Sequence, residues 1–274
     1  AMKLGCLDYN FNFLPFPSSM ARAGTYSFMG LARLGIIKRY RYTLRALQKI
    51  SSMGFEGVQI MCEDVSQMSL WPDRLNELVD ELDLYITSLG GYTNFFDKSR
   101  MERFKRVIDY AAGAGTNIVC THSGRGEDRN MMLKNMSKAV DYAASHDIII
   151  ALENSPLHSV STIDDVLSVL KEIPKLRLNF DPANFNLAGE DTEKAANKLG
   201  KYFVHAHAKD SIKPFSFPPL GKGEVPWSEI LGILKKQHYN GFLVVEYEGQ
   251  GDPIKQTVED KEYLEKELEK LESL

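Results

Sequence analysis

The sequence predicts a single α/β domain folded as a (β/α)8 TIM barrel, and three observations lead to this prediction. Short apolar runs of strand length alternate with amphipathic helical segments, which is typical of a parallel sheet covered by helices. Eight such units can be counted along the chain, and eight units close a barrel. An open, doubly wound sheet is the alternative, but no Gly-x-Gly-x-x-Gly motif follows the first apolar run, where such a sheet usually carries one.

The first unit has a long segment between its strand and its helix. Residues 3–8 have the composition of a short strand, whereas residues 9 to about 40 are rich in Phe, Pro, Ser and Gly and lack a helical period. Loops of this length in compact domains are usually functional lids or insertions. Apolar side chains at helical spacing then predict a helix over 41–53, which Gly54 ends in the manner of a C-cap.

The remaining units repeat this order with shorter connections. We expect the other seven strands at residues 57–62, 84–89, 117–122, 148–154, 176–181, 202–209 and 242–248. We expect the helices that follow them at residues 71–82, 100–114, 128–145, 162–172, 192–199, 226–237 and about 254–272. Thr162, with Asp165 three residues later, has the spacing of an N-terminal capping box. The last helix is charged and amphipathic, and is expected to pack against the barrel or to contribute to a homo-oligomer.

Composition and charge are those of an ordinary globular protein of enzyme size. The 274 residues carry a formal net charge of -4, so no basic excess points to nucleic acid as a partner. No Ser/Gly-rich linker divides the chain, and one domain is expected over 1–274. The N-terminus lacks a signal-peptide pattern and no window approaches about 18 uninterrupted apolar residues, so we expect a cytoplasmic protein without a membrane partner. Cys6, Cys62 and Cys120 lie in apolar runs without CxxC spacing, which indicates reduced core thiols.

Four consecutive predicted strands carry an ionisable residue at or near the carboxyl end. These residues are Glu153, Asp181, His207 and Glu246. In a barrel the carboxyl ends of the strands converge on one volume at the mouth, where three carboxylates would repel one another unless protons or a cation neutralise them. One divalent metal ion with mostly oxygen ligands and one imidazole meets this need, and the donor set suits Mn, Mg, Co or Zn. Alternatively, each carboxylate could cap a helix or pair with a basic residue.

The seventh strand has a polar face within a stretch that otherwise looks buried. Because strand side chains alternate with a period of two, His205, His207 and Lys209 share one face. We expect His205 to lie one layer below His207, as a core or supporting residue. Lys209 could hold a substrate oxyanion or phosphate, or pair with a nearby carboxylate.

Several motifs around these residues resemble those of one known superfamily. The motifs are ALEN at 151–154, NFDPANF at 179–185, VHAHAKD at 204–210, PLGKGEVPWSEIL at 219–231 and GFLVVEYEG at 241–249. They resemble the sugar phosphate isomerase/epimerase superfamily with the xylose isomerase-like TIM barrel, which also includes the endonuclease IV-type enzymes (AP endonuclease family 2). The likeness extends from about residue 41 to residue 248.

Similarity to the ketose 3-epimerase branch of this superfamily implies roles for the residues at the strand ends. It implies that Glu153, Asp181, His207 and Glu246 are the metal ligands, and that the two glutamates also act as acid and base on opposite faces of the substrate carbon. The chain departs from that branch where a histidine, an arginine and a glutamate are expected, and has Asn184, Lys213 and Ser159 instead. The metal ligands are therefore retained while the substrate contacts differ, so the resemblance does not carry the substrate over.

Further residues are candidates for binding substrate. His122, at the tip of the fourth strand, could bind substrate or a second metal ion, or be a hydrogen-bonded structural histidine. Asn154 and Asn184 could bond substrate hydroxyls or tie down loops, and Lys213 replaces the arginine of the epimerase branch. Residues expected on the rim of the site are Asp8, Glu63, Arg125 and His158. An aromatic group, Trp71, Tyr92, Phe95 and Phe96, could form an apolar wall or belong to the core.

One loop contains a Gly-x-Gly sequence, at residues 218–224. Its backbone N–H groups could cradle a phosphate, or the loop could be the usual connection before the next helix.

The favoured function is a metal-dependent isomerase or epimerase of a sugar or sugar phosphate. It would act by proton abstraction and return at a carbon next to a carbonyl, a chemistry that an inositol-ketose dehydratase shares. An endonuclease IV-like abasic-site nuclease is an alternative, but that branch needs three metal ions and many histidines, and this chain has six histidines and an acidic balance. A non-catalytic sugar-binding barrel is the third interpretation.

Overall fold

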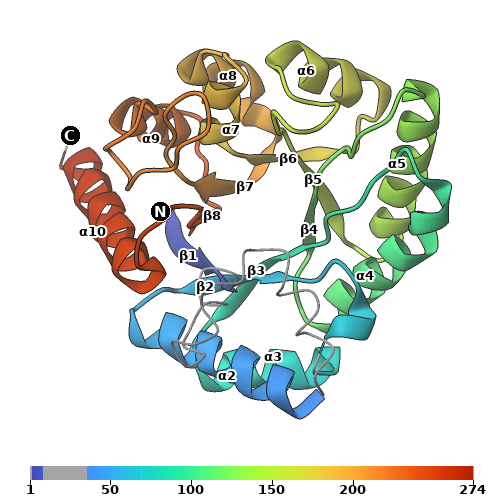
Figure 1. The fold of residues 1–274 in the computed structure, drawn as a ribbon, viewed down its shortest axis with the longest axis horizontal. Helices are drawn as coiled ribbons and strands as arrows, with labels where there is room; N and C mark the ends of the chain where they lie inside the picture. Colours follow the sequence, from blue (N-terminus) through green and yellow to red (C-terminus); the bar gives the residue numbers. More distant parts are fainter. Residues whose placement is uncertain (1, 9–35, 69, 274) are drawn as a thin grey trace.

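The computed structural model describes residues 2–8, 36–68 and 70–273, and in this part of the chain eight parallel strands form a closed barrel. Each strand pairs with its neighbours in sequence, and β1 closes the ring against β8, with Cys6 paired to Val245. Figure 1 looks into this ring, with the helices arranged around it. The strands are β1 (Lys3–Leu7), β2 (Gly57–Met61), β3 (Tyr85–Gly90), β4 (Ile118–Thr121), β5 (Ile149–Glu153), β6 (Arg177–Phe180), β7 (Phe203–Ala208) and β8 (Phe242–Val245).

The α-helices cover the outside of the barrel. They are α2 (Ile36–Ser52), α3 (Pro72–Glu81), α4 (Met101–Gly113), α5 (Arg129–Ala144), α6 (Ile163–Glu172), α7 (Pro182–Leu187), α8 (Thr192–Leu199), α9 (Trp227–Lys236) and α10 (Pro253–Glu272). Helix α10 lies in the outer ring beside α9 and contacts β8 (Figure 1). The sequence-based prediction of a (β/α)8 TIM barrel is confirmed, since the strands form a single closed parallel sheet.

One predicted helix boundary is wrong, and one short helix was not predicted. Helix α2 begins at Ile36, five residues before the predicted start at residue 41, because the run 36–43 contains no helix breaker although its apolar pattern becomes regular only from Leu44. Helix α7 follows β6 without having been predicted. Its six residues are too few to show a helical period, but Asp181 caps it and Pro182 stands at its first position. The rest of the predicted long loop, residues 9–35, lies outside the described residues.

Packing between the barrel and the helices accounts for the core. The largest fully buried side chains include Trp227, Phe104 and Phe180, from helices and strands on different sides of the ring. Helix α6 begins with the predicted capping box, in which the Thr162 hydroxyl accepts the Asp165 N–H at 3.2 Å and Asp165 Oδ2 accepts the Thr162 N–H at 3.0 Å. These contacts satisfy two of the free N–H groups at the helix N-terminus.

The three cysteines are buried, and no disulfide joins them among the described residues, in agreement with the predicted core thiols. None of the helices in the described part of the chain has the length and apolar character of a membrane span.

Candidate metal centre

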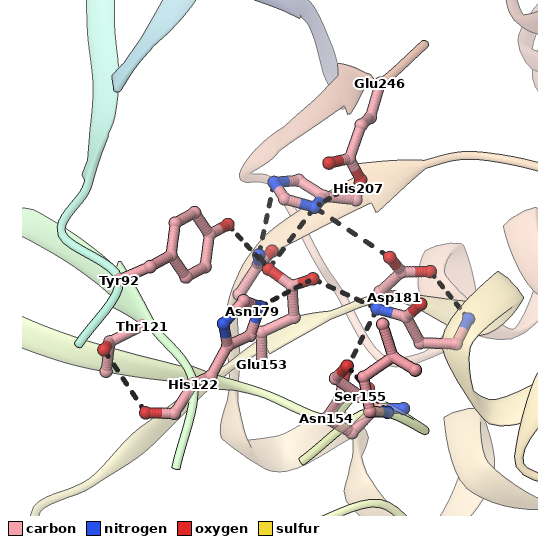
Figure 2. Close-up of polar contacts among 12 residues, drawn as sticks. Tyr92, Thr121, His122, Glu153, Asn154, Ser155, Asn179, Asp181, His207 and Glu246 are labelled. Atoms are coloured by element: carbon pink, nitrogen blue, oxygen red, sulfur yellow. Dashed lines mark hydrogen bonds and ion pairs between the residues drawn. The ribbon is translucent and has the colours of Figure 1, made fainter. Parts of the chain in front are cut away.

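The structure brings the four ionisable strand-end residues together at one end of the barrel. Glu153 is the last residue of β5, Asp181 follows β6, His207 lies in β7 and Glu246 follows β8. One candidate donor atom from each lies within 4.8 Å of the others. Asp181 and His207 are inaccessible to solvent and Glu153 is nearly so. Figure 2 shows the His207 imidazole lying between Glu246 on one side and Glu153 and Asp181 on the other.

Glu153 is held by hydrogen bonds to both of its carboxylate oxygens. The hydroxyl of Tyr92 and the amide of Asn179 each donate to Oε2 at 2.8 Å (Figure 2). The amide of Asn184 donates to Oε1 at 3.1 Å. Burial raises the pKa of the Glu153 carboxyl to about 7, because the attraction of His207 only partly offsets the loss of water. This carboxylate is therefore held in one orientation by partners on both of its oxygens.

His207 is oriented by a polar residue on a strand from another part of the barrel. Its Nε2 lies 2.7 Å from Oε1 of Gln59 on β2, so Nδ1 faces the three carboxylates. Burial alone would lower the pKa of His207, but Glu246 and Glu153 outweigh it and raise this pKa to about 9. A hydrogen bond to the outer ring nitrogen is the usual device that orients a metal-binding imidazole.

Two buried polar atoms of the cluster, Oδ2 of Asp181 and Nδ1 of His207, make no aligned hydrogen bond with the described residues, although each lies within ion-pair distance of a charged group. The other oxygen of Asp181 accepts the Asn184 N–H at 3.0 Å, as the N-cap of α7. Nδ1 of His207 lies 3.0 Å from Oε2 of Glu246, but not in the alignment of a hydrogen bond. Buried polar atoms are rarely left without partners, and a carboxylate oxygen and an imidazole nitrogen are typical ligands of divalent metals. The residues present therefore fit a bound divalent cation.

Lys209 places a buried ammonium group against the same cluster. Its Nζ lies 2.9 Å from Asp181 Oδ2, 2.9 Å from Glu246 Oε2 and 3.0 Å from Glu248 Oε2. Burial alone would raise the pKa of Glu246, but Lys209 and His207 hold it well below its usual range. Of the two predicted roles for Lys209, the structure thus shows the ion pairs with carboxylates.

A cavity of about 740 Å³ opens above the cluster. Its lining includes Glu153 and Glu246 at the cluster and, further out, His122, Arg125 and His158. This volume is in the range of small-molecule binding sites. The cluster is therefore accessible to a ligand from the cavity, even though most of its atoms are buried.

His122 lies in the middle of a stack of three rings on the cavity wall. Its ring centroid lies 4.2 Å from that of Tyr92 and 4.1 Å from that of His158. Its Nε2 lies 3.9 Å from Oε1 of Glu153. Burial lowers the pKa of His122 well below its usual value, and the neighbouring His158 acts in the same direction, so the ring is neutral.

Of the other residues predicted to bind substrate, Asn184 and Asn154 lie beside the cluster, whereas Lys213 does not. Asn184 lines the cavity, but its amide donates to Glu153 and, at 3.0 Å, to the carbonyl of Asn154, so it supports the cluster directly. Asn154 is buried and its amide nitrogen has no partner among the described residues. The structure does not bring Lys213 to the cavity, because its half-exposed ammonium points to Glu224, 3.5 Å away.

The Gly-x-Gly loop at 218–224 is not a phosphate cradle. The N–H groups of Gly221 and Gly223 donate to Oδ2 of Asp210 at 2.9 and 3.0 Å, and those of Ser211 and Val225 donate to Oδ1 at 2.8 and 3.1 Å. The carboxylate of Asp210 thus takes the place that the phosphate interpretation gave to a ligand, and the loop is a structural connection.

The predicted aromatic wall is divided between surface, cluster and core. Trp71 is 81% exposed, Tyr92 bonds Glu153, and Phe95 is buried with its ring edge-on to Phe104. His205 lies below His207, with Nδ1 2.9 Å from Oδ1 of Asn179 and Nε2 3.2 Å from the hydroxyls of Thr87 and Ser88.

Sequence reasoning did not identify Gln59, Asn179 or Glu248 as part of the site. A weak signal was present, because Gln59 is the single polar residue of β2, and Asn179 stands between two apolar residues of β6 and shares a face with Asp181. Glu248 follows Glu246 by two residues, beyond the end of β8.

Comparisons with known proteins agree with this architecture. The family model of the xylose isomerase-like TIM barrel matches residues 47–272. The chain is 27% identical over 249 residues to the uncharacterized protein MJ1311 of Methanocaldococcus jannaschii, covering 80% of this chain and 84% of that protein. It is 20% identical over 230 residues to the D-psicose 3-epimerase of Enterocloster bolteae, covering 73% of this chain and 75% of the relative.

A solved structure with the same fold is the D-allulose 3-epimerase of Methylomonas sp. in complex with D-allulose. Its TM-score is 0.75 at 16% identity, and the match covers 97% of each chain. At this identity the likeness shows the fold.

Proposed function

This chain belongs to the family of xylose isomerase-like TIM barrels, and we propose that it is a divalent-metal-dependent isomerase or epimerase of a sugar or sugar phosphate. The observation that carries the proposal is the buried cluster of three carboxylates and one imidazole at the mouth of the barrel, open to a cavity. The distant similarity to a D-psicose 3-epimerase supports the same reaction class.

Four residues would hold the metal ion, namely Glu153, Asp181, His207 and Glu246. When bound, a divalent ion stabilises negative charge on the substrate oxygen next to the carbon that loses its proton. Mn, Mg, Co and Zn all suit three carboxylates and one imidazole. The hydrogen bond from His207 to Gln59 keeps the imidazole turned toward this position.

Proton transfer is assigned to the two glutamates. Glu153 comes from β5 and Glu246 from the end of β8, so they reach the cavity from strands that are separated by β6 and β7. One carboxylate takes the proton from the substrate carbon and the other returns a proton to the opposite face or to the adjacent carbon. Tyr92 and Asn179 keep Glu153 in one orientation, and Lys209 does the same for Glu246.

The nuclease and binding-protein alternatives have less support. The ligand cluster contains a single histidine, and the net charge of -4 provides no general attraction for a phosphate backbone. A sugar-binding barrel without catalysis would not require two glutamates held by separate sets of partners in one cavity. A dehydratase would begin with the same proton abstraction and differs in the product, which loses water.

Metal content and isotope exchange test the proposal together. We expect about one divalent ion per chain in the purified protein, and incorporation of solvent deuterium into a ketose, aldose or sugar phosphate. Glu246→Gln should lower the exchange rate at least about 100-fold, since it removes an acid or base group. The matched control is Glu259→Gln on α10, where the carboxylate is an exposed partner of Lys255.

Two outcomes contradict the proposal. One is a protein that exchanges protons while free of metal, and the other is a metal-loaded protein that exchanges with none of the carbohydrates. Mass analysis of the products distinguishes isomerisation from dehydration.

A further inference from the structure

The cationic side chains that line the cavity differ in whether they have an acidic partner. Lys209 is surrounded by three carboxylates, and Nε of Arg100 lies 3.2 Å from Oδ2 of Asp97. Arg125 also lines the cavity, but no carboxylate of the described residues lies within ion-pair distance of it. Within this part of the chain, its positive charge is available to a ligand.

The backbone that carries Arg125 is tied to loops on both sides. The amide of Asn94, in the loop after β3, donates to the carbonyl of Arg125 at 3.1 Å. Gly124 has a φ of +79°, and a Cβ at this position would collide with Asn94. The carbonyl of Gly124 accepts the N–H of Ser159, in the loop after β5, at 3.0 Å. Arg125 is therefore presented at a defined place on the cavity rim.

The guanidinium group is also oriented. Nε of Arg125 donates to the carbonyl of Leu157, which leaves the two terminal nitrogens without a partner among the described residues. These nitrogens form a planar fork that matches two oxygens of a phosphate or carboxylate group. An arginine with its Nε bonded to protein and its fork open is pre-organised for an oxyanion.

The neighbouring imidazole is compatible with an anion at this place. His158 lines the cavity beside Arg125, and its ring stacks on that of His122, which in turn lies 3.9 Å from Glu153. Burial lowers the pKa of His158, and the nearby charge of Arg125 does the same, so the ring is neutral and can donate one N–H. The ring stack connects the carboxylate cluster to Arg125 along one wall.

The charges that line the cavity would orient a ligand that has one anionic end. Glu153, Asp181, Glu246 and Glu248 carry four negative charges, against one positive charge on Lys209 and two on a bound divalent cation. This end of the cavity therefore keeps a net negative charge and repels an anionic group, whereas Arg125 attracts one. A substrate with one anionic end would thus place that end at Arg125 and its reacting carbons toward the glutamates.

We propose that the substrate of this site is a carbohydrate that bears a phosphate or carboxylate group, and that the Arg125 guanidinium binds this group. The inference rests on the proposed function, and it adds the chemical class of the substrate. The phosphate-binding element is then a side chain after β4, and not the Gly-x-Gly loop whose N–H groups bond Asp210.

Calorimetric titration of the protein in the presence of Mn²⁺ measures whether charged carbohydrates bind more tightly than neutral ones. The probes are D-ribulose and D-fructose, their 5-phosphate and 6-phosphate esters, and D-fructuronate as the carboxylate analogue. We expect the esters or the uronate to bind at least about tenfold more tightly than the neutral ketose, because bidentate bonds to a charged group are strong. Comparison of the phosphate and carboxylate series identifies which oxyanion is preferred.

Variants of Arg125 test whether this residue causes the preference for charged compounds. Arg125→Met should abolish the preference for the charged compounds, and Arg125→Lys should keep only part of it, because lysine lacks the fork. The matched control is Arg129→Met, which removes an exposed arginine of α5 that donates to Ser168 and does not line this cavity. This control should keep the full preference. Thermal unfolding checks that each variant is folded.

Three results would overturn the inference: no binding of any charged compound, equal binding of charged and neutral compounds, or a preference that survives in Arg125→Met. The last result would indicate direct binding of the oxyanion to Mn²⁺. Failure here is distinct from failure of the proposed function, since metal content and deuterium exchange into neutral ketoses are measured independently of Arg125.

Discussion

At the scale of single residues, Lys209 shows how the cluster balances its charge. Its ammonium lies 2.9 Å from one oxygen each of Asp181 and Glu246, and both residues belong to the candidate donor set. A divalent ion and the ammonium would therefore compete for the same negative charge. Glu248, 3.0 Å from Nζ and outside the donor set, provides a third partner for the ammonium when a metal binds.

Lys209→Met should therefore tighten metal binding. Two like charges about 4 Å apart repel by a few kcal/mol at the effective dielectric of a protein site, so we expect Mn²⁺ to bind at least about tenfold more tightly. Calorimetric titration of the metal-free protein measures this directly. The control is Lys213→Met, because the Lys213 ammonium pairs with Glu224 away from the cavity. Weaker binding in Lys209→Met would instead mean that the lysine is needed to hold the carboxylates in place.

The roles of single residues could be predicted from sequence only where they lie at strand ends. Asp181 and Glu246 were identified because each follows an apolar strand. Gln59 was not, because its hydrogen bond to His207 joins residues 148 positions apart. Such a contact depends on closure of the barrel, and the local sequence does not encode it.

At the scale of elements, the loop between β7 and α9 is organised by one buried carboxylate. Asp210 accepts four backbone N–H groups, from Ser211, Gly221, Gly223 and Val225. The loop begins with Lys209 and includes Phe217, and Nζ of Lys209 lies 5.5 Å from the centroid of the Phe217 ring. Asp210 thus links the conformation of this loop to the position of Lys209.

Asp210→Ala should be much more destabilising than the loss of an ordinary helix cap. Four N–H groups would lose a charged acceptor, so we expect a loss of about 3–5 kcal/mol in the free energy of unfolding. Asp191→Ala is the comparison, because Asp191 caps α8 through the single N–H of Lys194 and should cost about 1 kcal/mol. Urea denaturation measures both, and equal losses would contradict the assigned role.

Helices were predicted where the sequence shows at least two turns of helical period or a capping signal, and one was missed where it shows less than two turns. The helix over 192–199 matches α8 exactly in its bounds, and the capping box of α6 was recognised from Thr162 and Asp165. Helix α7 has only six residues and was missed. A helix of under two turns is stabilised by its tertiary contacts and its cap more than by its own pattern.

At the scale of the whole molecule, α10 fastens the last part of the chain to the barrel. Oδ1 of Asp260 on α10 accepts the N–H of Leu220 at 2.8 Å and the amide of Gln256 at 2.9 Å. Asp260 is only 5% exposed. Burial raises the pKa of its carboxyl to about 6, because these hydrogen bonds do not fully replace the lost water.

This raised pKa predicts a pH dependence of global stability. Between about pH 4 and pH 6 the folded protein holds the Asp260 proton while the unfolded chain has lost it, so this group lowers the free energy of unfolding as the pH rises. The loss is of order 3 kcal/mol and is complete above about pH 6. Asp260→Asn should remove this part of the pH dependence.

Urea denaturation from pH 4 to pH 7 measures the difference between the two proteins. Asp141→Asn serves as control, because Asp141 is a largely exposed partner of Lys175. Parallel stability curves for wild type and Asp260→Asn would contradict the prediction.

The sequence by itself determined the order of the strands and helices, the closure of eight units into a barrel and the four residues at the strand ends. These follow from patterns among consecutive residues, and from the rule that parallel strands converge at their carboxyl ends. Only the tertiary structure decided which partners those residues have. The contacts of Tyr92 and Asn179 with Glu153, those of the three carboxylates with Lys209, and the open fork of Arg125 arise where strands and loops far apart in the sequence meet in space. The physical reason is that hydrogen bonds and ion pairs depend on distance and direction in space, which the closed barrel sets and the local pattern does not.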